Sequence, residues 1–261
     1  MIEGMRDLFN KLIWKLGQPL TTKPRGEGVP VSDLFLWRND DLDTVFELLC
    51  LPGFFSDLIE SETVQVMLFD HNGAQVLTDT IRIKSGQRIS LDLEPHTRGY
   101  GSYGTMAFFH HGTTEEFRRL KTHLAERGYT AFRLKGNHFK SYVHGNYDAI
   151  CLAPNGQMQL LGGTSFLRRK YYVQYVFNPH VSYEIALVNP TPKMQKIKLS
   201  TFEAKAMSAV ESSIQLAPRG SRIIEYTSRP NSWTLVLESR MVMIRPIIFR
   251  HDRKKLDVFH G

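Results

Sequence analysis

From residue 31 to the C-terminus, the apolar residues of this chain recur mostly with a period of two, and this alternation limits what the chain can fold into. Alternation of that kind places successive side chains on opposite faces of a β-strand. Turn sequences such as Asn72-Gly73 and Ser85-Gly86 separate the runs. We therefore predict a mainly β protein. The predicted strands are 33–38, 44–49, 63–70, 76–84, 89–93, 130–134, 141–143, 149–152, 171–177, 183–188, 195–202, 213–216, 221–226, 234–238 and 244–249.

Two segments show a helical period instead. Residues 1–16 carry apolar side chains at helical spacing, which predicts an N-terminal amphipathic helix, and a Gly- and Pro-rich linker follows up to residue 28. The proposed contact residues of this helix are Phe9, Leu12, Ile13 and Trp14. Farther on, Thr113 and Glu116 fit a capping box, which predicts one short helix inserted among the strands and ending before Gly128.

An internal repeat divides the β region into two halves. In each half a strand ends in a polar turn, and a later strand follows a Gly-x-Arg-Ile sequence, at Gly86–Ile89 and at Gly220–Ile223. This pattern resembles the paired hairpins of immunoglobulin-like sandwiches. The resemblance implies two tandem immunoglobulin-like β-sandwich domains, 29–153 and 154–261, after the helix and linker of residues 1–28. It implies no function, because one fold hosts many functions.

The net charge of +7 is distributed unevenly along the chain. Residues 1–28 carry five basic and three acidic side chains, residues 29–152 carry twelve and sixteen, and residues 153–261 carry sixteen and seven. The segments therefore have net charges of +2, −4 and +9, which sum to +7. This division suits head-to-tail association, in which the acidic half of one copy meets the basic half of another.

The densest polar cluster consists of His144, Asn146 and Asp148. On a strand these three alternate residues would project from one face. A histidine, an amide and a carboxylate together suit binding of a metal or a sugar, or acid–base work, and His110 could join them from another strand. The alternative is a turn at Gly145-Asn146, in which Asp148 bonds backbone groups.

A basic and aromatic strand is the second candidate for binding. It contains Arg168, Arg169, Tyr171 and Tyr175, and arginine beside tyrosine can hold a phosphate, an acidic sugar or single-stranded nucleic acid. The alternative is a strand whose long basic side chains are merely solvated. Nucleic acid is disfavoured as a partner, because no recognised helix or stacking module accompanies the charge.

Other classes of function find no motif in the sequence. The two cysteines, Cys50 and Cys151, are too few for a disulfide framework, and the ten histidines show no metal-ligand spacing. No nucleophile elbow or phosphate-binding loop occurs. We therefore expect no metal and no cofactor, and we favour a protein without catalytic activity.

Two hypotheses of function remain. The first is a non-enzymatic binding or scaffold protein that assembles with itself or a protein partner through its sheet surfaces and its N-terminal helix. The alternative is a carbohydrate-directed enzyme or carbohydrate-binding accessory protein that uses the polar cluster at the seam between the domains, with an acidic ligand or a glycan as its partner.

No signal-peptide pattern is visible, so we expect a cytoplasmic location. Peripheral contact with the inner membrane face is the alternative for the helix.

Overall fold

The computed structural model of the protein describes residues 11–12, 15–16, 23–24, 28–51, 53, 60–111, 118–121, 123–145, 148–204, 209–242, 245–252 and 255–261. Within these ranges, α2 (Glu94–Thr97) is the one helix that spans a full turn, and single pairs of helical residues occur at 11–12, 15–16 and 118–119. The remaining regular structure is β, so the predicted mainly β character is confirmed.

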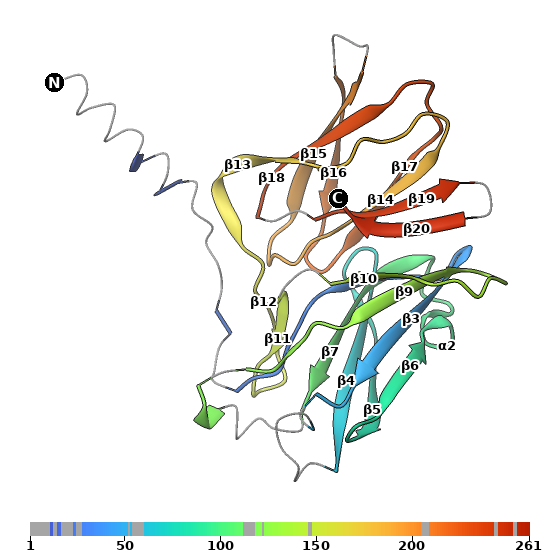
Figure 1. Cartoon of the computed structure of the whole chain (residues 1–261). Helices are drawn as coiled ribbons and strands as arrows, with labels where there is room; N and C mark the ends of the chain where they lie inside the picture. Colours follow the sequence, from blue (N-terminus) through green and yellow to red (C-terminus); the bar gives the residue numbers. More distant parts are fainter. Residues whose placement is uncertain are drawn as a thin grey trace.

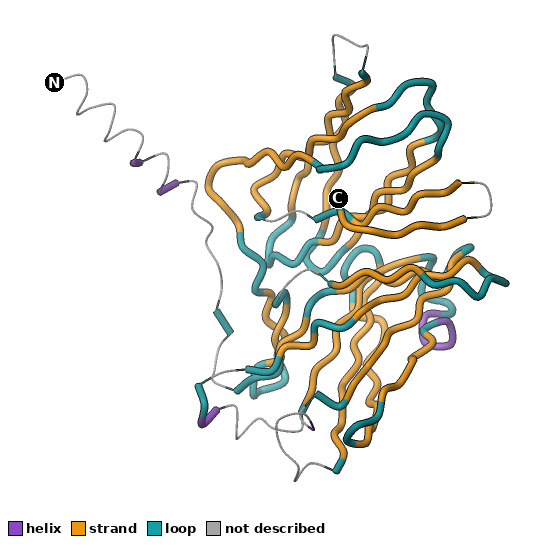
Figure 2. Tube along the Cα trace, viewed as in Figure 1, coloured by secondary structure: helices purple, strands orange, loops and turns teal. Residues whose placement is uncertain are grey.

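The described strands form five four-stranded sheets (Figures 1 and 2). The small sheet has the order β12 (Met158–Leu160), β11 (Ile150–Leu152), β1 (Val31–Ser32), β8 (Ala125–Glu126). The β3 sheet has the order β10 (Ser141–His144), β9 (Tyr129–Leu134), β3 (Leu42–Leu49), β6 (Arg88–Asp92). The central sheet has the order β2 (Phe35–Arg38), β7 (Tyr103–His110), β4 (Ser61–Asp70), β5 (Gln75–Lys84).

Residues 164–260 supply the other two sheets, which lie above the first three in Figure 1. The β15 sheet has the order β13 (Thr164–Tyr172), β18 (Trp233–Met241), β15 (Gln195–Glu203), β16 (Val210–Leu216). The β14 sheet has the order β17 (Ser221–Tyr226), β14 (Ser182–Val188), β19 (Ile247–Asp252), β20 (Lys255–His260).

This arrangement overturns the predicted fold class. Five four-stranded sheets correspond to a five-bladed β-propeller, and the prediction of two tandem immunoglobulin-like sandwiches is wrong. Alternation in a sequence identifies strands, but it does not identify which strands pair. The small sheet shows the difficulty, because its parallel pair joins residues 31–32 to residues 125–126, and neither run is long enough to show a period.

The predicted helices have different outcomes. Ala125–Glu126, near the end of the predicted inserted helix, is strand β8, whereas most of that helix and its proposed cap at Thr113 and Glu116 lie outside the described residues. Most of the N-terminal helix also lies outside them, including Phe9, Ile13 and Trp14. Leu12 lies in one of the helical pairs and is 53% exposed.

Strands β2 and β7 of the central sheet and the 66–69 part of β4 are buried on both of their faces, whereas the edge strand β5 is largely exposed. Phe35 and Phe108 face the β3 sheet and belong to one apolar cluster, whereas Leu36 and Phe109 belong to another cluster that includes Phe249 from the β14 sheet. Strands covered on both faces are expected to be continuously apolar rather than alternating. The runs 104–109 and 66–69 fit this expectation, since every residue in them is buried. A pattern that alternates apolar and polar residues therefore describes these runs poorly.

A tight contact fixes the first strand of the central sheet. The indole Nε1 of Trp37 donates to the carbonyl oxygens of Phe69 and Thr105 at 3.0 and 3.1 Å, although Trp37 is fully buried. A Cβ atom added to Gly104 would lie 2.7 Å from the Trp37 ring and nearer still to the Phe69 carbonyl oxygen. Glycine is therefore required at this place in β7, because any side chain would force β2 or β4 to move.

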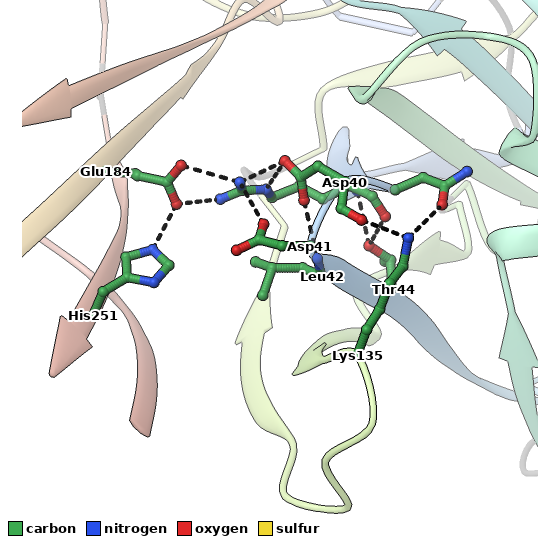
Figure 3. A network of polar contacts seen from close by, with 9 residues as sticks. Asp40, Asp41, Leu42, Thr44, Lys135, Glu184 and His251 are labelled. Carbon is green, nitrogen blue, oxygen red and sulfur yellow. Dashed lines mark hydrogen bonds and ion pairs between the residues drawn. The ribbon is translucent and has the colours of Figure 1, made fainter. Parts of the chain in front are cut away.

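A charged network joins the central sheet to the β14 sheet (Figure 3). Arg38 is 3% exposed, and its Nη1 and Nη2 atoms donate to the two carboxylate oxygens of Glu184 at 2.6 and 3.1 Å. The same guanidinium donates to Asp40, and it lies 4.7 Å from the centre of the Phe249 ring. His251 approaches Glu184 from β19 at 2.7 Å. Arg38 is thus paired on several sides at a site from which water is largely excluded.

We predict that Arg38→Met lowers the free energy of unfolding by about 3 kcal/mol, because it leaves the largely buried carboxylate of Glu184 without its main partner. The double variant Arg38→Met/Glu184→Met should recover part of this loss. Arg98→Met is the matched control, because Arg98 is exposed in its pair with Glu94 and should contribute little. Urea unfolding at pH 7 measures all three. An Arg38→Met loss no larger than that of Arg98→Met would contradict the prediction.

Candidate functional site

The basic strand singled out in the sequence corresponds to the edge strand β13 (Thr164–Tyr172), which begins and ends before the predicted strand 171–177, so Tyr175 lies beyond its end. Arg168 and Arg169 are both exposed, and Arg168 lies 3.8 Å from Glu238. Tyr171 and Tyr175 have a structural role instead, because both pack against the apolar cluster between the β15 and β14 sheets. The register pairs Arg169 with Ser239 and Tyr171 with Leu237, so Arg169 lies on the same side of β13 as Tyr171. Arg168 lies on the other side, near Glu238.

Alternate residues of the β15 sheet form one outward surface, which we call the basic face. The register pairs Lys170 with Glu238 and Lys198 with Glu238, so these side chains share a side of the sheet. The members of the basic face are Phe166, Arg168, Lys170, Tyr172, Thr234, Val236, Glu238, Arg240, Lys196, Lys198, Ser200, Phe202, Glu211, Ser213 and Gln215. Its five basic and two acidic side chains give a net charge of +3.

Large apolar groups lie among these charges. Phe166 is 63% exposed, Tyr172 is 64% exposed and Phe202 is 43% exposed. The guanidinium of Arg240 lies 5.9 Å from the centre of the Phe166 ring, at the reach of a cation–π contact. The opposite side of the same strands is buried and holds Leu199 and Leu237, so the basic face rests on a packed core.

Two of the five basic groups of the basic face are neutralised by its two carboxylates. Lys198 Nζ lies 2.6 Å from Glu211, and Arg168 lies 3.8 Å from Glu238. Within the described part of the chain, Lys170 and Lys196 have no acidic side chain within ion-pair distance. The exposed positive charge of this face is therefore available to an anionic surface.

The polar cluster predicted around His144 is divided in the structure. His144 Nδ1 donates to the carbonyl oxygen of Gly145 at 2.8 Å, and its ring lies 4.4 Å from that of His260. Asp148 instead pairs with Arg127 at 2.8 Å. Asn146, the third member, lies outside the described residues. His144 and Asp148 thus have different partners.

His260 joins His144 from the other half of the chain. Its Nε2 atom donates to the His144 carbonyl oxygen at 2.9 Å. Burial lowers the pKa of His260 to about 4 and outweighs this hydrogen bond, so the ring is neutral near pH 7. His260 therefore contributes packing and one hydrogen bond to the seam, without a charge.

His110 lies at the end of β7 and is held between two carboxylates. Its Nδ1 atom is 2.9 Å from Glu62 Oε1, and its Nε2 atom is 2.6 Å from Glu126 Oε2. All three side chains are at most 4% exposed. Burial opposes the charge on His110, but the hydrogen bonds to Glu126 and Glu62 outweigh it and raise its pKa to about 9. Both ring nitrogens are occupied, so His110 supports its neighbours and is not open to a ligand.

His110 was predicted as a site residue from the sequence, but its partners Glu62 and Glu126 were not. Glu62 carries a detectable signal, because it occupies the same alternating phase as Val64, Val66 and Leu68, and a carboxylate in an apolar phase requires a buried partner. Glu126 carries no such signal, since it was assigned to a helix and lies in the two-residue strand β8.

Comparisons with known proteins add no family to this description. No protein-family model matches the chain, and no curated protein does. Among solved structures, the chain is similar to a glycosyl hydrolase family 2 member from Bacteroides cellulosilyticus, with 8% identity and a TM-score of 0.16. The alignment covers 95% of this chain and 30% of that one, so the chain spans less than a third of that protein. A likeness this weak carries no argument about fold or function.

Two further findings concern the described residues alone. No three or more of their histidine, cysteine, aspartate and glutamate side chains are grouped so that they could hold a metal ion. None of their helices combines the length and the apolar character that crossing a membrane requires.

We predict that the stability of the protein falls as the pH rises from about 6.5 through about 9. The raised pKa of His110 means that its contribution is complete below the unfolded pKa of 6.5 and is lost above the folded pKa. A shift of this size corresponds to at most about 3 kcal/mol. His110→Gln should lower stability at pH 6 and flatten this part of the pH profile, whereas His138→Gln, at an exposed position, should leave it unchanged. Urea unfolding between pH 6 and 9.5 measures the profile; equal profiles for wild type and His110→Gln would refute the assignment.

Proposed function

We propose that the chain is a non-enzymatic binding protein that assembles with an acidic protein surface through the basic face. The acidic half of a second copy is the partner surface that the sequence itself supplies, since residues 29–152 carry a net charge of −4. Head-to-tail contact of this kind joins two different surfaces and can therefore extend beyond a dimer.

One observation carries the proposal: the basic face combines exposed aromatic rings with two lysines, Lys170 and Lys196, that have no acidic partner among the residues that the structure describes. Protein interfaces are enriched in aromatic residues and arginine, and the aromatic groups often supply most of the binding energy. Phe166 and Tyr172 on β13 provide such groups, and Lys170 lies between them along the strand. A merely solvated basic surface would not need two large rings that are more than 60% exposed.

The position of the face within its sheet supports the same function. β13 and β16 are the two edge strands of the β15 sheet, and the basic face extends from one edge to the other. The charges favour approach of an acidic surface, and the rings then lose contact with water on association. The two contributions act at different stages, so salt and ring removal should affect binding differently.

We predict that Lys170→Glu/Lys196→Glu abolishes association with acidic protein surfaces. Light scattering of the full chain measures self-association at ionic strengths of about 0.01 M and about 1 M, where the screening length falls from about 30 Å to about 3 Å. Immobilised poly-L-glutamate serves as the probe for an acidic polypeptide. The wild type should associate at low salt and dissociate at high salt.

Lys84→Glu/Arg222→Glu is the control, because it makes the same total change in charge at exposed positions away from the basic face. It should retain association at low salt, whereas Tyr172→Ala should weaken association at low salt without changing the net charge. A protein that stays monomeric in every condition and does not bind poly-L-glutamate refutes the proposal. Equal losses in the two charge-reversal variants would show a general effect of net charge and would also refute it.

A further inference from the structure

A cavity of about 630 Å³ lies on the outward side of the β3 sheet, away from the basic face. Its floor consists of residues from β3, β6, β9 and β10, and the segment 125–128 forms a wall. This volume lies in the range of pockets that enclose small molecules. Most of the lining is apolar, with a few charged groups at defined positions.

Two tyrosine rings give the cavity its aromatic side. Tyr129 and Tyr142 are 55% and 45% exposed. Tyr129 is opposite His144 in the register of β9 and β10, and Tyr142 lies two residues before His144, so the rings are diagonal neighbours on one face. Exposed rings at this spacing offer flat apolar surfaces to a ligand, and each hydroxyl group stays free to form hydrogen bonds at its edge.

Two carboxylates provide fixed acceptors at the same cavity. Glu126 is 3% exposed, and one of its oxygens is held by His110 at 2.6 Å. Glu47 is 8% exposed and accepts hydrogen bonds from Ser90 at 2.7 Å and Arg88 at 3.1 Å. Burial would raise the pKa of Glu47, but these hydrogen bonds lower it, so the acceptor is ionised at neutral pH.

Gly128 keeps the wall close to the floor. A Cβ atom at this position would lie 2.8 Å from Glu126 Oε1 and 2.7 Å from the Phe46 ring. The carboxylate of Glu126 is therefore fixed from two directions, by His110 on its Oε2 side and by the backbone of the wall on its Oε1 side. Such positioning before a ligand arrives reduces the entropic cost of binding.

The charges of the lining cancel. Glu47 and Glu126 supply two negative charges, and Arg88 and Arg127 supply two positive charges. A charged ligand would meet as many like charges as opposite ones, whereas a neutral ligand with both donors and acceptors can use all four groups. A ligand with one apolar face also matches the tyrosine rings. These requirements together describe a neutral, polyhydroxylated ring.

We infer that this cavity binds a neutral sugar ring, which stacks on Tyr129 and Tyr142 and donates hydroxyl hydrogen bonds to Glu47 and Glu126. Arg88 donates to the sugar oxygens from the floor. The site is independent of the proposed function, because it shares no residue with the basic face. Its ligand class also differs from the acidic protein surface proposed there.

Saturation-transfer NMR and calorimetric titration test this inference with the full chain. The probes are the methyl glycosides of glucose, galactose, mannose and N-acetylglucosamine, with glucuronic acid and glucosamine as charged counterparts. At least one neutral glycoside should bind in a saturable manner. Tyr142→Ala and Tyr129→Ala should each weaken this binding about tenfold, because each removes one stacking surface.

Three control variants keep the result specific. Tyr142→Phe retains the ring and should retain binding, and Phe139→Ala removes an 85% exposed ring outside the cavity and should have no effect. Lys170→Glu/Lys196→Glu should bind the sugar normally, which separates this site from the basic face. Thermal melting verifies that each variant is folded. Three results would overturn the inference: no saturable binding of any neutral glycoside, unchanged binding in both tyrosine-to-alanine variants, or tighter binding of a charged sugar than of its neutral counterpart.

Discussion

Burial of both faces of β2 and β7 in the central sheet is the constraint on which the rest of this structure depends. A sheet with two apolar faces must be covered on both sides, and here the β3 sheet covers one side and the β14 sheet helps cover the other. The ends of such a sheet present a problem, because polar groups there are withdrawn from water. Arg38, at the end of β2, and His110, at the end of β7, lie at opposite ends of the central sheet and on opposite faces.

At each end of the central sheet lies a buried cation that is paired with at least two carboxylates. Arg38 is paired with Glu184 and Asp40, and His110 with Glu62 and Glu126. Each cation joins segments that are distant in the sequence, so each pair also specifies which sheets lie together. The network at Arg38 links the two halves of the chain, whereas the one at His110 positions the wall of the cavity. Glu126 therefore contributes both to the stability of the fold, through its pair with His110, and to the geometry of the candidate sugar site.

The sequence allowed many of the strands to be predicted, but it missed β7, β12 and β20, and it predicted the assembly of the strands poorly. The reasons are physical. Predicted strand 221–226 coincides with β17, because alternation and flanking turns are local properties. The sheets depend on long-range pairing, as between β2 and β7, which no local pattern encodes. A strand was predicted at 171–177, whereas β13 spans Thr164–Tyr172 and holds Arg168, because β13 is an edge strand with a register shift and shows no regular alternation.

The same limit explains which parts of the sites were predictable. Arg168 and His110 were found because each residue type is conspicuous in its own segment. The cavity was missed because Tyr129 and Tyr142 are separated by thirteen positions and become neighbours only through the register of β9 and β10. Glu126 acquires its role only because β8 is brought beside the end of β7, where His110 can reach it. A carboxylate fixed in this way differs from an exposed one in a single respect that matters for binding: its direction is set before a ligand arrives, so the ligand need not order it.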